Sequence, residues 1–417
     1  MKKLKITLIF SILFIQILCC SVFADELPID SEAAILIETN SQIVLYEKNS
    51  KEKMYPASTT KIMTAILVIE NCNLDDIVTV SANSLKAIPD GYVVGGIYEG
   101  EQLTVSDLLY ELLLKSANDV AVVLAEHVSG SVENFAKLMN EKAKELGCTN
   151  TNFVNPNGIH DENHYSTADD LSIIAKYCMK NETFRKIVST PKASLPKTNK
   201  YNFTDRTFSN TNELIIPNGK YYYEYATGIK TGYTKEAKSC LIASAEKDDM
   251  SLISVVLGGN SSTNGKDTRF VDTTTLFEYG LNNFKHTEFK KANEFITTIE
   301  IENATKETKE LQLKIKDSLE ALHTKDFDFE NLKPKITLND NILAPIEKDT
   351  VLGTVSYEVD GITYKSELLA NSNVEKQTYY LIFIIAGISI LIFVIIIVLI
   401  IKTLTKKKRK VRIRYKR

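Results

Sequence analysis

Two polar residues at the start of an apolar segment have the spacing of an activated nucleophile and its base. Ser58 and Lys61 lie three positions apart in the run Ser58-Thr59-Thr60-Lys61. On a helix, this spacing puts both side chains on one face, about a turn apart. A partly desolvated lysine near other cations has a lowered pKa and can take the serine proton. The pattern therefore suggests Ser58 as nucleophile and Lys61 as base, although a serine here also suits a plain helix N-cap.

A hydroxyl and an amide follow further along the chain, two positions apart in Ser116-Ala117-Asn118. They lie in a stretch with a helical pattern, residues 104–128. The Ser116 hydroxyl could relay a proton, and the Asn118 amide could hold a substrate carbonyl. The tripeptide alone has little specificity.

A third polar group, Lys230-Thr231-Gly232, opens the part of the chain with a β pattern. A lysine and a hydroxyl on an edge strand suit a peptide carboxylate, and the glycine permits close backbone approach. The N–H groups of Ser58, at a helix N-terminus, and of Tyr233 could together form an oxyanion hole. A plain turn is the alternative interpretation of this third motif.

The hydrophobic pattern predicts strands on both sides of a helical middle. Residues 33–39 and 42–47 flank Asn40-Ser41 and favour a β-hairpin. Helices are expected over 58–70, 104–128, 132–146, 167–180 and 273–283, and strands from 229, over 241–245 and over 252–257. This order indicates an α+β domain over residues 25–285, with helices covering an antiparallel sheet.

The residue pattern changes over 290–370 and predicts a small all-β domain. The segment 311–315 alternates between apolar and polar residues, and 355–359 meets Ile362 across Asp360-Gly361. Asp-Gly between alternating runs is a strong hairpin signal. Residues 371–378 are polar and predict a short linker.

The net charge of −3 is a sum of unlike segments. Three lysines and no acid lie in residues 1–24, and ten basic residues and no acid lie in 402–417. Residues 25–401 therefore hold all 53 acids against 37 bases. An acidic body argues against nucleic-acid binding, because that footprint should be basic on the folded domain.

Both basic ends adjoin apolar runs, which indicates a membrane protein. Lys2, Lys3 and Lys5 precede a run of about 13 apolar residues that ends near a small-residue site, typical of a signal peptide over 1–24. The uncharged segment 381–401, with aromatic residues 379 and 380 before it, is long enough to span a bilayer as a helix. The positive-inside rule then puts the tail 402–417 in the cytoplasm and the acidic body outside.

Cysteine and histidine usage does not favour a metal site or a histidine triad. The body has four widely spaced cysteines without a C-x-x-C pair, which we expect to be small buried residues, although pairing stays open. There are five histidines in the chain, and no G-x-S-x-G elbow. His160 and His164 are four apart, but the acid between them is misplaced for H-E-x-x-H. We therefore expect no metal and no cofactor.

Together, the three motifs in this order resemble the active-serine penicillin-recognising enzymes. The surrounding stretches are similar to the D-alanyl-D-alanine carboxypeptidases, the low-molecular-mass penicillin-binding proteins, over most of residues 30–285. The β domain and anchor repeat that family's layout, although many members carry an amphipathic helix in place of a span. The matching stretches are 56–64, 115–119, 151–158, 164–171 and 229–234.

The resemblance implies a β-lactamase/transpeptidase-like catalytic domain and a role for each motif residue. Ser58 would be the nucleophile, Lys61 the base and Ser116 the proton relay. Arg269 resembles the family's arginine near the substrate carboxylate, although a salt bridge to Asp267 or Asp272 would also account for it. The residues implied to contact substrate are Asn118, Lys230, Thr231, Gly232, Tyr233 and Arg269.

The resemblance also implies the substrate: the chain would remove the terminal D-alanine of peptidoglycan stem peptides, and β-lactams would acylate it. Three other functions stay open: a DD-endopeptidase acting on crosslinks, a β-lactamase, and a non-enzymatic β-lactam sensor. A β-lactamase needs neither the β domain nor the anchor. A sensor would need a larger cytoplasmic part than a basic tail of 16 residues.

Overall fold

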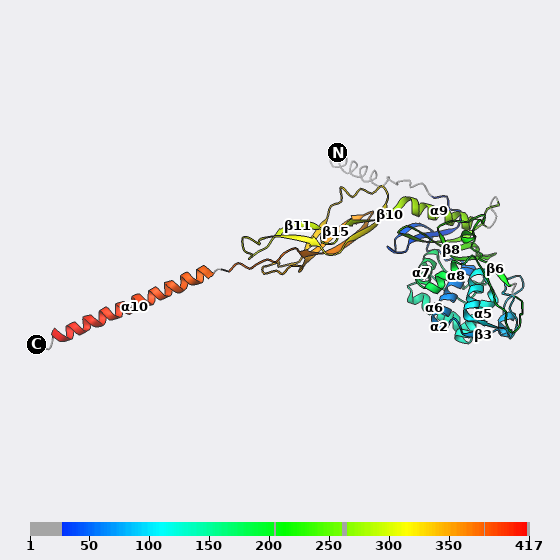
Figure 1. Ribbon diagram of the computed structural model, residues 1–417, viewed down its shortest axis with the longest axis horizontal. Helices are drawn as coiled ribbons and strands as arrows, with labels where there is room; N and C mark the ends of the chain where they lie inside the picture. Colours follow the sequence, from blue (N-terminus) through cyan, green and yellow to red (C-terminus); the bar gives the residue numbers. More distant parts are fainter. Residues whose placement is uncertain (1–26, 204–205, 261–264, 379, 415–417) are drawn as a thin grey trace, which may run out of the picture. The chain divides into compact units, whose positions relative to one another are not determined.

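The computed structural model describes residues 27–203, 206–260, 265–378 and 380–414, with the side chains of 408–414 left out. The predicted signal peptide, residues 1–24, lies outside the described part. The chain forms two compact units that divide between Lys285 and His286, and each is considered by itself (Figure 1).

The first unit is built around a five-stranded antiparallel sheet. Its order is β2 (Val44–Lys48), β1 (Ala33–Glu38), β9 (Met250–Gly259), β8 (Lys238–Lys247) and β7 (Ala226–Thr234). The predicted hairpin is confirmed, since β1 pairs with β2. The chain's first strand pairs with its late strand β9, so the helical middle is an insertion between neighbouring strands.

Helices cover both faces of this sheet. On one face lies α9 (Thr268–Asn283), where Gly280 packs so closely that a Cβ would be 2.9 Å from Leu252 and 3.0 Å from Leu36. Side chains alternate along a strand, so Leu36 and Leu252 share this face and their neighbours point to the other. Figure 1 shows α9 on one side of the sheet and α7 (Ala168–Met179) on the other.

The helical layer surrounds α2 (Lys61–Asn71), whose first eight residues are all buried. It follows a short 3-10 turn, Ala57–Thr60. The remaining helices of this unit are α3 (Ala82–Lys86), α4 (Val105–Tyr110), α5 (Asn118–Ser129), α6 (Val132–Glu145) and α8 (Glu182–Val188). Two short strand pairs complete it: β3 (Ile77–Thr79) with β4 (Gln102–Thr104), and β5 (Lys192–Ser194) with β6 (Thr207–Ser209).

The helix-rich stretch expected over 104–128 is confirmed, but it is not one continuous α-helix. After α4, a π-helical turn covers Glu111–Lys115, and Ser116 then adopts a left-handed conformation with φ 70° before α5 begins. The hydrophobic pattern continues through the break because both flanking segments face the same core. A π turn followed by a left-handed residue re-aims the chain, a feature common at functional sites.

The second unit is the all-β domain that the sequence predicts. Its main sheet has the order β11-β12-β16-β15-β14, and the Asp360-Gly361 turn joins β15 to β16 as expected. Alternate residues of β15 are buried, which gives the sheet one core face. Val374 is also buried and pairs with Ile346, so this part of the predicted linker 371–378 packs on the domain. The strands are β10 (Phe284–Lys290), β11 (Phe295–Glu300), β12 (Glu310–Ile315), β13 (Leu319–Thr324), β14 (Lys335–Leu338), β15 (Val351–Val359) and β16 (Ile362–Ala370).

The chain ends in one long helix, α10 (Tyr380–Arg414). Within it, Tyr380–Lys407 is long and apolar enough to cross a membrane, and none of its apolar core is buried against the rest of the protein. A fully exposed apolar helix of this length fits a membrane anchor.

Candidate active site

Ser58 and Lys61 meet at the junction between the 3-10 turn and α2. Lys61 Nζ lies 2.8 Å from Ser58 Oγ, as the three-residue spacing predicts. The turn begins at Ala57, whose φ of 48° redirects the chain, and Thr59 closes it by hydrogen bonds to the Pro56 carbonyl. Ser58 is half-buried at the cleft, whereas Lys61 is fully buried beneath it.

The Lys61 amine has three oxygen neighbours and no carboxylate among them. Besides Ser58 Oγ, Nζ is 2.9 Å from Asn118 Oδ1 and 2.6 Å from the Asn157 carbonyl. Burial lowers the pKa of Lys61 well below its ordinary value, and the nearby Lys230 lowers it further, against a smaller opposing effect of Asp119. A neutral amine at this position can accept the Ser58 proton.

The loop that supplies the Asn157 carbonyl is packed directly against the 3-10 turn Ala57–Thr60, called the nucleophile turn below because it carries the predicted nucleophile Ser58. Gly158 has φ +77°, and a Cβ there would lie 1.9 Å from the Ala57 carbonyl oxygen. One residue earlier in this loop, Pro156 accepts a hydrogen bond of 2.6 Å from Thr64 on α2. The run Asn155-Pro156-Asn157-Gly158, which lies in the matching stretch 151–158, is therefore packed against the site.

Ser116 and Asn118 lie where the π turn passes into α5. Asn118 is anchored on both sides, because its Nδ2 donates to the Val93 carbonyl over 2.9 Å while its Oδ1 receives Lys61. Ser116 lines the same cleft as Ser58 and is 9% exposed. No hydrogen bond in the described part of the chain joins Ser116 Oγ to Ser58 or Lys61.

The edge strand β7 forms the opposite wall, as the sequence predicts. A Cβ on Gly232 would lie 3.1 Å from the backbone nitrogen of Ser58 and 3.0 Å from the Pro56 carbonyl. Only a glycine lets the strand approach the nucleophile turn this closely. The backbone of β7 at Gly232-Tyr233 is therefore beside the Ser58 N–H, where an oxyanion hole would have to be. The Tyr233 side chain itself is 57% exposed.

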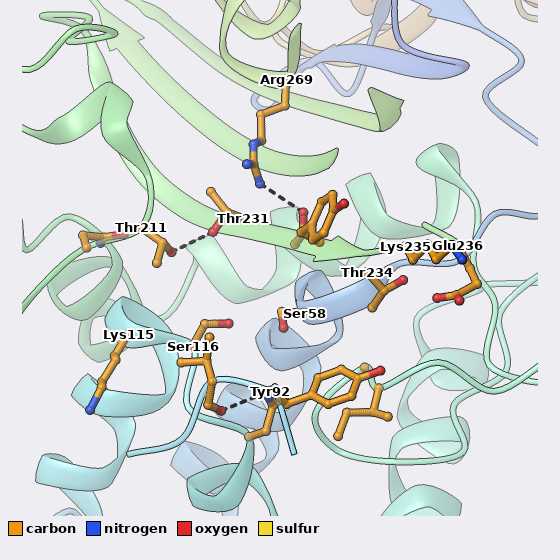
Figure 2. Close-up of a pocket in the computed structure, with 18 of the residues that line it drawn as sticks. Ser58, Tyr92, Lys115, Ser116, Thr211, Thr231, Thr234, Lys235, Glu236 and Arg269 are labelled. Atoms are coloured by element: carbon orange, nitrogen blue, oxygen red, sulfur yellow. Dashed lines mark hydrogen bonds between the residues drawn. The ribbon is translucent and has the colours of Figure 1, made fainter. Parts of the chain in front are cut away.

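Lys230 and Thr231 are held in different ways on this strand. Lys230 is fully buried, and its Nζ donates to the Thr231 carbonyl over 3.0 Å. Burial lowers the pKa of Lys230 to about 7, and Arg269 contributes to the lowering. Thr231 Oγ1 lies at the cleft and is hydrogen-bonded to Thr211 Oγ1 over 2.7 Å (Figure 2).

Arg269, at the start of α9, forms the salt bridge to Asp267 that the sequence offered as one alternative, and it also borders the cleft. Its Nε and Nη2 donate to the Asp267 carboxylate, over 2.8 and 2.5 Å, and its Nη1 donates to the Gly232 carbonyl over 3.1 Å. The salt bridge to Asp267 thus orients the guanidinium toward β7. Figure 2 shows Arg269 approaching the strand from the side away from Ser58.

These residues line one cleft of about 630 Å³. Ser58, Ser116, Asn118, Thr231, Gly232, Tyr233 and Arg269 border it, and the buried Lys61 and Lys230 lie beneath its surface. Sequence reasoning missed several wall residues, because they carry no motif and come from separate loops. The missed residues are Gly91, Tyr92, Val93, Ile159, Asn210, Thr211, Glu213, Lys235 and Glu236.

Of the histidine pair His160 and His164, the second has a structural role in the catalytic unit. His164 is buried, with Nε2 2.9 Å from Thr60 Oγ1 and Nδ1 accepting from the Val154 N–H. Burial lowers the pKa of His164 to about 4, which keeps the ring neutral. Among the described residues, no cluster of His, Cys, Asp and Glu could hold a metal ion. The cysteines are unpaired: Cys72, Cys148, Cys178 and Cys240.

Comparison with known proteins identifies the family. Residues 21–261 match the family profile described as D-alanyl-D-alanine carboxypeptidase. The chain belongs to the D-alanyl-D-alanine carboxypeptidase family. Residues 284–376 match a second profile, the C-terminal domain of penicillin-binding protein 5, which covers the all-β unit. The fold class expected from the motifs is thereby confirmed.

Relatives of this family extend over nearly the whole chain. The D-alanyl-D-alanine carboxypeptidase DacF of Bacillus subtilis is 36% identical over 387 residues, 90% of this chain and 93% of its own length. The crystal structure of penicillin binding protein 5 from Haemophilus influenzae has a TM-score of 0.64 at 29% identity, covering 84% of this chain and 98% of that one. The Streptomyces K15 DD-transpeptidase has a TM-score of 0.56 at 33% identity and covers 61% of this chain and 98% of that one.

Proposed function

We propose that Ser58 is the acylated nucleophile of this D-alanyl-D-alanine carboxypeptidase and that Lys61 is its general base. The observation that carries the proposal is the position of the fully buried Lys61 Nζ, 2.8 Å from Ser58 Oγ, where its hydrogen-bond partners among the described residues include no carboxylate. The chain is a serine-type hydrolase of peptidoglycan metabolism. Its substrate is a stem pentapeptide ending in D-Ala-D-Ala.

In the acylation step, the Ser58 hydroxyl proton passes to Lys61 Nζ as Oγ attacks the carbonyl carbon of the penultimate D-alanine. The N–H groups of Ser58 and Tyr233 stabilise the oxyanion. Collapse of the intermediate breaks the peptide bond, and the leaving amine of the terminal D-alanine takes a proton relayed by Ser116. Water then hydrolyses the ester on Ser58, with Lys61 again accepting a proton.

Binding of the terminal carboxylate falls to the β7 side of the cleft. Thr231 Oγ1 and the Arg269 guanidinium supply donors, and the buried Lys230 supplies positive charge behind them. Charge-assisted hydrogen bonds of this kind are stronger than neutral ones. Asn118, fixed between Lys61 and Val93, orients the acyl part of the substrate. The same groups suit a β-lactam, which carries both an acylating amide and a carboxylate.

The membrane arrangement extends the proposal to the location of the enzyme. An exported catalytic unit, anchored by the uncharged segment 381–401 of α10 with the basic tail 402–417 in the cytoplasm, would have its cleft on the wall side of the membrane. The all-β domain would then be a spacer between bilayer and cleft. Shortening it should leave the activity on soluble peptides intact and lower the activity on intact cell walls.

Mass spectrometry of muropeptides after incubation with the full-length enzyme tests this function. Loss of one D-alanine from pentapeptide stems is the expected product. Cleavage of crosslinked dimers without D-alanine release would instead indicate an endopeptidase. Rapid hydrolysis of benzylpenicillin, with no long-lived acyl-enzyme, would indicate a β-lactamase and overturn the proposal.

A further inference from the structure

A buried carboxylate behind the Ser116 side of the cleft has no part in the mechanism above. Glu111 is 1% exposed and is the first residue of the π turn. Its Oε1 lies 3.5 Å from Lys115 Nζ. In the described part of the chain, its Oε2 has no hydrogen-bond partner. Burying a carboxylate oxygen without a hydrogen-bond partner destabilises the fold, so we expect a function of Glu111 that offsets this cost.

The backbone of Glu111 is tied to the relay residue. Its carbonyl accepts the N–H of Ser116 and, over 3.5 Å, that of Ala117. Ser116 is the left-handed residue at which the chain turns into the cleft. The position of the π turn therefore sets where the Ser116 hydroxyl lies.

The side chain of Glu111 faces the loop that covers this side of the cleft. A Cβ on Gly95 would be 3.0 Å from the Glu111 carboxyl carbon, so the loop backbone lies directly on the carboxylate. Lys115 Nζ donates to the Gly95 carbonyl, and the Gly95 N–H donates to Asp119 Oδ1 over 2.8 Å. Two residues earlier in the loop, the Val93 carbonyl receives both the backbone N–H and the Nδ2 of Asn118. Glu111, Lys115 and the loop thus form one packed unit with Asn118.

We propose that Glu111 is a positioning residue that, in its ionised form, holds Lys115 and the loop at Gly95 in place and so aligns Ser116 and Asn118 for acylation. This inference rests on the proposed roles of Ser58 and Lys61. Glu111 does not border the cleft, so it acts only through its neighbours.

The charged groups facing Glu111 make its ionisation sensitive to pH near neutrality. They are Lys115 on its own turn, Asp119 on α5 and Arg206 before β6. Burial raises the pKa of Glu111 to about 7; Lys115 and Arg206 act against this, and Asp119 acts with it. Glu111 is therefore ionised above about pH 7 and neutral below it, where Lys115 loses its counter-charge.

The test compares acylation by benzylpenicillin in the full-length enzyme and in Glu111→Gln, across a pH series. At about pH 8.5, E111Q should acylate about ten-fold more slowly, a factor equivalent to about 1.4 kcal/mol. At about pH 5.5 the two rates should converge, because wild-type Glu111 is then also neutral. Lys61 and Lys230 also titrate, but equally in both proteins, so the ratio of rates isolates Glu111.

Two further variants separate positioning from a general loss of structure. Lys115→Met should reproduce the E111Q profile, and the double variant should be no slower than K115M alone, because Glu111 acts through Lys115. Glu38→Gln removes another buried carboxylate, one that accepts from Ser41 on the far edge of the sheet. It should leave the pH profile of acylation unchanged.

Three results would overturn the inference. One is a ratio of E111Q to wild-type rates that does not change with pH, and another is additive effects of E111Q and K115M. The third is a shift of the same size in E38Q. Thermal unfolding of each variant identifies misfolded protein, and in that case a Glu111→Asp variant, which keeps the carboxylate, should retain the pH dependence. Absence of any acyl adduct in the wild-type enzyme would instead be a failure of the proposed function.

Discussion

Lys61 Nζ lies 2.8 Å from Ser58 Oγ, one helical turn away and with no carboxylate within its hydrogen-bond shell. A lysine surrounded by neutral oxygens in a buried site is more easily deprotonated than a lysine in water. The pair therefore has the geometry that the proposed nucleophile and base require. The predictions below depend on that relationship and on the packing that maintains it.

Lys61→Arg should lower the rate of acylation by about 100-fold or more, the usual contribution of a general base. The guanidinium keeps its proton at every relevant pH, so it cannot accept one from Ser58. In the wild type, the rate should fall as the pH drops below the lowered pKa of Lys61. Stopped-flow measurement of acylation over a pH series gives both the effect of K61R and the pH dependence of the wild type. A K61R rate within a few-fold of the wild type would remove Lys61 from the role of base.

Lys230→Met should stabilise the protein while impairing its activity. The pKa of Lys230 is lowered by burial, and further by Arg269, to about 7, so the folded state resists its charge. Between about pH 7 and the ordinary lysine value, the unfolded chain binds more protons, and wild-type stability therefore rises with pH in this window. At neutral pH, K230M should unfold with a free energy higher by at least ~1 kcal/mol, since one pKa unit corresponds to 1.36 kcal/mol.

Denaturant titrations of wild type and K230M at several pH values check this account. The difference in the free energy of unfolding should shrink as the pH rises from about 7 toward the ordinary value for lysine. Two results would contradict the lowered pKa of Lys230. One is a difference in the free energy of unfolding that does not change with pH, and the other is a K230M that is less stable than the wild type at every pH.

Gly158→Ala should be far more damaging than Gly130→Ala, although both glycines have φ +77°. Alanine at Gly130 meets no atom within 4 Å and pays only the left-handed penalty of about 1 to 2 kcal/mol. At Gly158 the new Cβ would lie 1.9 Å from the Ala57 carbonyl oxygen, so the nucleophile turn must move. We expect at least a ~100-fold loss of acylation in G158A, given the sensitivity of catalysis to small displacements. Comparable rates in the two variants would show that the contact with Ala57 is unimportant.

Arg269→Ala should affect substrates according to their C-terminal charge. Loss of a charge-assisted hydrogen bond of about 1.5 to 3 kcal/mol corresponds to roughly ten- to 100-fold in kcat/KM for a peptide with a free carboxylate. The corresponding peptide amide should be affected much less. Arg185, which also donates to a backbone carbonyl but lies outside the cleft, provides the matched control as Arg185→Ala. Equal losses of kcat/KM for both peptides would show that Arg269 does not bind the substrate carboxylate.

Local chemistry explains which parts of the site were predictable. The spacing of Ser58 and Lys61 alone puts both side chains on one helical face, and the glycine at 232 marks the close approach of β7. The hairpin of β1 with β2 and most helices follow from the hydrophobic pattern, and the structure confirms them, whereas the pairs β3–β4 and β5–β6 were not predicted. The alternation in residues 355–359 likewise predicts the β15–β16 hairpin.

The missed features depend on contacts between distant segments. The π turn at Glu111–Lys115 does not interrupt the apolar pattern, so periodicity could not reveal it. Thr211 and Val93 enter the site from loops that carry no motif. Thr211 is hydrogen-bonded to Thr231, and the Val93 carbonyl accepts two hydrogen bonds from Asn118. Glutamate is usually exposed on helices, so the sequence gives no sign that Glu111 is buried. Only the fold shows it.

The most direct test of the central claim is the release of D-alanine from a pentapeptide by the full-length enzyme and by Ser58→Ala, together with the intact mass of each after benzylpenicillin. The wild type should release D-alanine and gain the mass of one penicilloyl group, on the peptide that contains Ser58. S58A should do neither, while unfolding at a similar temperature. D-alanine release by folded S58A, or a penicilloyl adduct on another residue, would contradict the account.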